Sequence, residues 1–134
     1  MLRAHAQVTR ALDAEMRTEH GLSVSSFEVL MFLGDAPAGR MRMAEIASRM
    51  LLTRSGITRL VDRLIELGYV RRSAAERDGR GLYAELTTSG AAKLEVARKT
   101  HRQGVREGFL DRLSTTDQLV LGDIWDRLLA EPSA

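Results

Sequence analysis

Residues 41–72 read MRMAEIASRMLLTRSGITRLVDRLIELGYVRR. Apolar side chains recur every three or four residues in 43–50 and again in 54–67, which predicts two short helices, each with one buried side. Thr53 lies between them and is a good N-cap for the second helix, while Gly68 is suited to the left-handed conformation that ends a helix. The stretch therefore predicts two helices joined by a tight turn.

A predicted hairpin follows the second helix. Residues 69–73 and 82–86 have the composition of strands, and the polar, glycine-containing segment 74–81 separates them. Taken alone, these strands are also compatible with an ordinary surface hairpin. Directly after two such helices they indicate the wing of a winged helix-turn-helix, a mainly α fold with a small β-hairpin wing that docks on DNA.

Positive charge is concentrated in this part of the chain. The whole sequence has 20 basic and 18 acidic residues, a net charge of +2. Residues 40–80 alone hold ten arginines and five acidic residues, hence a local net charge of +5. This basic middle predicts an anionic partner, with a solvated charged surface as the alternative.

The outer side of the helix 54–67 has side chains of the kinds that recognise DNA. Arginine pairs with guanine through two hydrogen bonds, serine and threonine bond to phosphates and bases, and the positive helix N-terminus attracts phosphate. An arginine at the hairpin tip can enter the narrow minor groove, and we expect Asp78 to hold such an arginine in position. The candidate DNA-binding residues are Thr53, Arg54, Ser55, Thr58, Arg59, Arg63, Arg77 and Arg80.

Gly56 is unusual because it lies inside this predicted helix, where glycine costs about 1 kcal/mol relative to alanine. Two explanations are open. A side chain there would hold the backbone away from DNA, or the surrounding residues leave no room for one.

Two helices are predicted before this centre. Residues 2–20 have a thin apolar stripe at helical spacing. A second helix runs to about Leu33 and begins at Ser23 or at the Ser25–Ser26 pair. Because the second helix is apolar on most sides, we expect it at the centre of the core. The segment 34–39, with two glycines and a proline, is predicted as a loop.

Two more helices are predicted after the hairpin. A long helix runs from Thr87 or Thr88 to about Leu113, and its expected apolar side comprises Ala92, Val96, Val105, Phe109 and Leu110, with Leu94 on one flank. Ser114 and Asp117 resemble a capping box that begins the last helix, which ends before Pro132. Trp125 in that helix is expected to be a core or a subunit-interface residue.

Several classes of function lack support in the sequence. There is no cysteine, which excludes disulfides and cysteine-ligated zinc. Nucleotide-binding glycine motifs, His-Glu-x-x-His and a plausible Ser-His-Asp set are missing, and the three histidines are scattered, so we expect no enzyme, no cofactor and no metal site. No apolar run reaches about 18 residues and no signal peptide is evident, so a cytoplasmic protein without a membrane partner is expected.

The sequence resembles the MarR (multiple antibiotic resistance regulator) transcription factors. The resemblance covers nearly the whole chain and is strongest between residues 27 and 90. The motifs that carry it are MAEIASRM (43–50), TRSGITRLVDRL (53–64), GYVRR (68–72), RDGR (77–80) and LTTSG (86–90). This chain departs from the family pattern at Leu51, where many members have glycine, and at Gly79, where arginine is common.

The resemblance implies a single domain, 1–134, with a winged helix-turn-helix at 24–87 and a helical dimerisation region made of 1–21 and 88–131. It implies a homodimer that binds double-stranded DNA, with the recognition helix 54–67 in the major groove and the wing 73–82 in the minor groove. It also implies a repressor that leaves a pseudo-palindromic operator when a small, often aromatic or phenolic, ligand binds near the first, second and long fifth helices. The alternative is a winged-helix module that binds protein without specific DNA binding.

Overall fold

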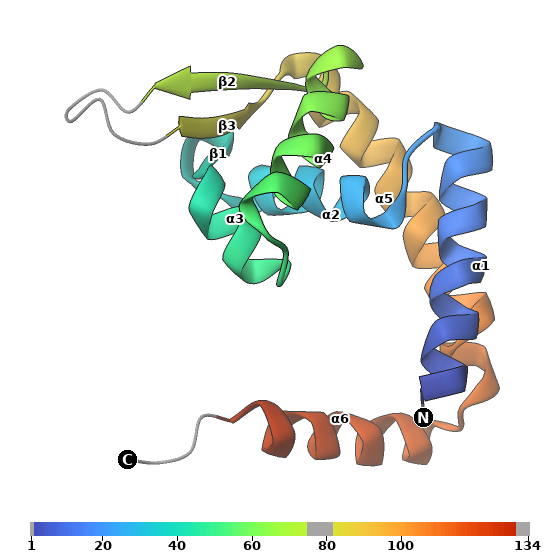
Figure 1. Cartoon of the computed structure of the whole chain (residues 1–134). Coiled ribbons are helices and arrows are strands. Elements are labelled where there is room, and N and C mark those ends of the chain that lie inside the picture. The colour runs from blue at the N-terminus through green and yellow to red at the C-terminus, as the bar shows by residue number, and fades with distance from the viewer. Residues whose placement is uncertain (1, 75–81, 131–134) are drawn as a thin grey trace.

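The computed structural model describes residues 2–74 and 82–130, and it is mainly helical with a small antiparallel sheet (Figure 1), as predicted. In chain order the elements are α1 (Leu2–His20), α2 (Val24–Asp35), the 3-10 turn η1 (Pro37–Gly39), β1 (Arg40–Arg42), α3 (Met43–Arg49), α4 (Arg54–Glu66), β2 (Val70–Ala74), β3 (Leu82–Leu86), α5 (Thr88–Gly108), the 3-10 turn η2 (Leu110–Arg112) and α6 (Thr115–Leu129).

The sheet has three strands in the order β1-β3-β2, whereas the sequence predicted two. In β1, Arg40 pairs with Glu85 and Arg42 with Tyr83 of β3. The prediction missed β1 because a three-residue strand is too short to display an alternating pattern, and its pairing partner lies more than 40 residues away. The sheet is therefore a hairpin extended by one short edge strand.

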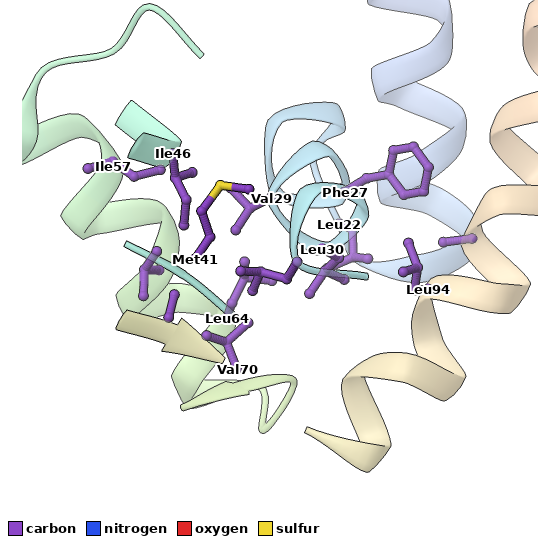
Figure 2. Close-up of a cluster of buried hydrophobic side chains, with 14 of the residues drawn as sticks. Leu22, Phe27, Val29, Leu30, Met41, Ile46, Ile57, Leu64, Val70 and Leu94 are labelled. Carbon is purple, nitrogen blue, oxygen red and sulfur yellow. The ribbon is translucent and has the colours of Figure 1, made fainter. Parts of the chain in front are cut away.

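The core surrounds α2, which confirms its expected central position. Ser23 begins this helix, because its side chain accepts a hydrogen bond from the Ser26 backbone N–H. Figure 2 shows side chains of α2 meeting those of α3, α4, β1 and α5 in one cluster. The largest fully buried side chains are Phe27, Met16, Leu22, Leu30, Leu33, Ile46, Ile57, Leu64, Val29 and Val61.

The structure corrects two expectations for α5. The helix ends at Gly108 instead of continuing to Leu113. Its buried residues are Gly90, Leu94, Ala97 and Gly104, whereas Ala92 is exposed and Val96 is 48% exposed. The expected side was wrong because α5 packs closely on α1 and α2 through glycines, and glycine contributes nothing to an apolar periodicity.

Helix α6 extends away from α2, α3 and α4 (Figure 1). The predicted capping box is confirmed, since Ser114 accepts from the Asp117 N–H while the Asp117 carboxylate accepts from the Ser114 N–H. Trp125 is 39% exposed, so it is not a core residue of this chain. Within residues 2–74 and 82–130, no helix is both long enough and apolar enough to cross a membrane.

Candidate nucleic-acid interface

Helices α3 and α4 form the predicted helix-turn-helix. Leu51 lies in the turn with a φ of 55° and is 92% exposed. It therefore occupies the left-handed region that many members of the resembled family fill with glycine, at a cost of roughly 1–2 kcal/mol. Thr53 caps α4 as predicted, because its hydroxyl accepts a hydrogen bond from the Gly56 N–H at 3.1 Å.

Helix α4 has one buried and one exposed side. Ile57, Val61 and Leu64 are buried against the core. All of the predicted DNA-binding residues at its start and along its outer side are exposed, namely Thr53, Arg54, Ser55, Thr58, Arg59 and Arg63. The structure thus brings these six residues together on one helix, and their contact with DNA stays a prediction.

The surroundings of Gly56 favour the packing explanation for this glycine. A Cβ atom at this position would lie 3.3 Å from Thr53 Oγ1 and 3.7 Å from Leu52 Cβ. The first of these distances is tight and involves the hydroxyl that caps the helix. A side chain at residue 56 would therefore press on the cap that begins α4.

Two ion pairs that sequence reasoning did not predict involve the sheet, and one of them connects it to α4. The Arg72 guanidinium on β2 lies 2.6 Å from the Asp62 carboxylate on α4. Across the hairpin, Arg71 donates to Glu85 at 2.8 Å, and this hydrogen bond holds the pKa of the Glu85 carboxyl below its usual range. The Arg72–Asp62 pair connects the hairpin to α4, and both pairs partly neutralise the basic middle of the chain.

The C-terminal end of α4 is tied to the beginning of α5. Gly68 has a φ of 81°, as its predicted role as a helix stop requires. Its carbonyl accepts a hydrogen bond from the Thr87 hydroxyl at 2.7 Å, and the Thr87 N–H donates to the Tyr69 carbonyl. A Cβ atom on Gly90 would overlap that same Tyr69 carbonyl, so glycine is required there. The end of the helix with the candidate DNA-binding residues is thus connected by hydrogen bonds to the beginning of α5.

Three predicted wing residues, Arg77, Asp78 and Arg80, lie outside the described residues. Their proposed contacts therefore stay predictions. The strands that lead to them are described, and Ala74 pairs with Leu82 at the end of the hairpin. In Figure 1 the hairpin projects on the opposite side of the molecule from α1 and α5.

Two hollows bear on the expected ligand pocket. One, of about 250 Å³, lies between α1, the end of α5 and η2 and does not reach α2. The other, of about 300 Å³, is formed by α2, η1, β1 and α3. Between α2 and α5, Phe27 is buried and stacks on His101 at 4.7 Å between ring centroids. Burial lowers the pKa of His101.

The chain is similar to known transcriptional regulators. Residues 20–81 match the MarR family model. The HTH-type transcriptional repressor YetL of Bacillus subtilis (strain 168) is 37% identical over 111 residues, which cover 81% of this chain and 66% of YetL. Among solved structures, the MarR family regulator Sco3205 from Streptomyces coelicolor, in complex with DNA, has a TM-score of 0.89 at 31% identity, covering 99% of this chain and 86% of that one. AbsC from Streptomyces coelicolor, another MarR family regulator, has a TM-score of 0.87 at 28% identity, covering 95% and 85%.

The chain spans less than two thirds of the curated relatives it matches, with 66% of YetL and 58% of the Bacillus subtilis regulator YkoM. All of these relatives and neighbours are named as transcriptional regulators, not as enzymes. Their names agree with the expectation that this chain is not an enzyme.

Proposed function

The chain belongs to the MarR family of transcriptional regulators, and on that basis we propose that it is a homodimeric, sequence-specific DNA-binding protein. One observation carries this proposal. Helix α4 buries Ile57, Val61 and Leu64 and leaves two arginines, a serine and a threonine exposed in its first two turns. A helix with that outer side is suited to base edges and phosphates in the major groove.

The dimer is proposed from α6. Six of its apolar side chains are exposed in the single chain, namely Leu119, Val120, Ile124, Trp125, Leu128 and Leu129. Exposed apolar area of this extent marks an interaction surface, since water contact with it is unfavourable. We propose that α1, α5 and α6 pair two copies of the chain, so that 1–21 and 88–131 form the dimerisation region and 24–87 binds DNA.

We further propose a repressor that a small aromatic or phenolic ligand releases from a pseudo-palindromic operator. The repressor name of YetL supports the role as a repressor. The family resemblance supports release by a small ligand. A duplex-release assay with a hydroxybenzoate as the probe tests it, and unchanged operator affinity at saturating probe would contradict release by that compound.

The first experiment is selection of binding sites from a pool of random duplexes, followed by fluorescence anisotropy on the selected duplex at several salt concentrations. We expect a pseudo-palindrome with half-sites about one helical turn apart, because a two-fold symmetric dimer presents two recognition helices at that spacing. Affinity should fall steeply with salt, since phosphate contacts release counterions. Weak binding to every duplex without enrichment would reject specific DNA recognition and favour a protein-binding module.

A further inference from the structure

The outer face of the sheet carries a cluster of arginines around Tyr83 that is not among the candidate DNA-binding residues of α4 and the wing tip. Directly paired residues of an antiparallel sheet point to the same side. Met41 and Ala84 are paired and buried, so they belong to the inner face. Arg42 and Tyr83, which are also paired, therefore belong to the outer face, and so do Arg40, Arg71, Ser73 and Glu85.

Two arginines of β1 lie over one aromatic ring on this outer face. The guanidinium carbon of Arg40 lies 4.7 Å from the centre of the Tyr83 ring, and that of Arg42 lies 5.3 Å from it. The electron-rich face of an aromatic ring attracts cations, so the Tyr83 ring limits where the two guanidinium groups move. Two like charges thus lie beside the same ring.

The cations of this face differ in whether a carboxylate neutralises them. Glu85 accepts a hydrogen bond from Arg71, and the charge of Arg40 adds a smaller contribution to lowering the pKa of the Glu85 carboxyl. Within residues 2–74 and 82–130, neither Arg40 nor Arg42 has a salt bridge, but Arg40 is half-buried near Glu85 whereas Arg42 is exposed. The positive charge that is available to a partner is therefore greatest around Arg42.

Arg42 also lies next to both parts of the proposed DNA interface. It pairs with Tyr83, one residue from Leu82, where the hairpin leaves for the wing tip. Helix α3 begins immediately after it. Arg42 therefore lies at the junction between the hairpin and the helix-turn-helix.

We propose that Arg42, held by the Tyr83 ring, binds a backbone phosphate of DNA beside the wing, and that Arg40 supplies a second positive charge. This inference rests on the proposed function. The planar guanidinium matches the geometry of a phosphate and remains charged at all physiological pH values. A phosphate contact adds affinity without reading sequence, so this cluster strengthens binding and α4 selects the site.

The test is anisotropy on the selected operator and on a scrambled duplex of equal length, each over a range of salt concentrations. Arg42→Ala should weaken binding to both duplexes by the same factor. The slope of log affinity against log salt should become shallower by about 0.9 for each phosphate that the protein no longer neutralises, or about 1.8 for a homodimer. Arg102→Ala, which removes an exposed arginine of α5 outside residues 24–87, is the matched control. Its slope should be unchanged when analytical ultracentrifugation shows the same mass as for the unchanged protein.

The role of Tyr83 as a positioning residue has its own test. Tyr83→Phe keeps the ring and should keep the slope of the unchanged protein, whereas Tyr83→Leu removes the ring and should make the slope shallower, though less than Arg42→Ala does. Arg42→Gln, which keeps most of the side-chain stem, repeats the charge removal if the alanine variant is less stable. Equal slopes for Arg42→Ala, Arg42→Gln and the unchanged protein would overturn this inference while leaving the proposed function standing, whereas failure of the unchanged protein to bind any duplex would overturn both.

Discussion

Helices α4 and α6 have similar apolar spacing but opposite surroundings. In α4 the apolar side, with Ile57, Val61 and Leu64, is covered by the core of the same chain. In α6 the corresponding side, with Trp125 and Leu128, is exposed. Helix α4 therefore already has its packing partner and offers a polar side to a ligand, whereas α6 offers its apolar side and requires a second protein surface.

Truncation of a side chain on the buried side of α4 should have the largest effect, a loss of folding stability. Leu64→Ala should lower the free energy of unfolding by about 2–5 kcal/mol, because Leu64 is fully buried and its removal leaves a cavity. Urea denaturation followed by circular dichroism measures this change. Leu51→Ala in the turn before α4, where the side chain is 92% exposed, is the control for an apolar truncation at the surface. Equal losses for the two variants would contradict the burial of the apolar side of α4, and with it the contrast with α6.

A charge on the apolar side of α6 should separate the subunits without unfolding the chain. Leu128→Asp places a carboxylate where we propose a dry interface, and we expect a loss of at least about 2 kcal/mol in dimerisation free energy. Analytical ultracentrifugation measures the mass, and circular dichroism checks that helix content is retained. Asp123→Ala, which removes an exposed acidic residue of the same helix, should leave the mass unchanged. A Leu128→Asp protein that remains dimeric would show that α6 is not part of the interface.

Removal of an exposed arginine from α4 should affect recognition and not stability. Arg59→Ala should reduce discrimination between the operator and a scrambled duplex by about 1–3 kcal/mol if the side chain reads a base. Anisotropy on both duplexes measures the ratio. Arg63→Ala is a useful comparison, since Arg63 pairs with Glu66 at 3.5 Å and is less available to DNA. An unchanged affinity ratio and unchanged operator affinity for Arg59→Ala would refute its assignment as a base-reading residue.

The smallest effect should come from removal of the N-terminal cap of α6. This cap depends on pH, whereas the cap of α4 does not. Hydrogen bonds from the Ser114 side chain and backbone N–H lower the pKa of Asp117 below its ordinary value of 3.8. Because the folded pKa is the lower one, the cap stabilises α6 fully above the ordinary value and loses its effect as the pH falls through the folded value. Thr53, which caps α4, has no carboxylate to protonate.

Circular dichroism between pH 6 and about pH 2 compares the unchanged protein with Asp117→Asn. The difference in helix signal between the two proteins should be largest above the ordinary aspartate pKa. It should disappear as the pH falls through the pKa of Asp117 in the folded protein. A difference that persists at the lowest pH would mean that the Asp117 side chain contributes by something other than its charge.

Local patterns predicted much of the fold because their physical causes are local. The cap at Thr53, the stop at Gly68 and the capping box at Ser114 each depend on residues within four positions, and all three are present. The buried side of α4 was also predicted correctly, since its apolar residues recur at helical spacing. Of the candidate site, the six residues 53–55, 58, 59 and 63 were predicted in this way. The structure leaves all six exposed, and their contact with DNA stays a prediction.

The features that the local sequence patterns did not predict depend on contacts between distant segments of the chain. Strand β1 exists through pairing with β3, and its arginines reach Tyr83 only because of that pairing. The buried side of α5 depends on close contacts at glycines, which carry no hydrophobic signal. The Asp62–Arg72 ion pair likewise joins a helix to a strand. The relative positions of these two elements cannot be predicted from a short stretch of sequence.

Caps, glycine stops and apolar periodicity were enough to locate the ends of α2, α3, α4 and the hairpin to within about two residues, because these signals act over one or two turns. The packing of the whole chain was needed to establish which side of α5 is buried, that the sheet has a third strand, and that α6 leaves its apolar side uncovered. The physical reason is that burial is a property of two surfaces together. A pattern identifies an apolar surface, and the packed chain determines whether that surface meets the core or awaits a partner.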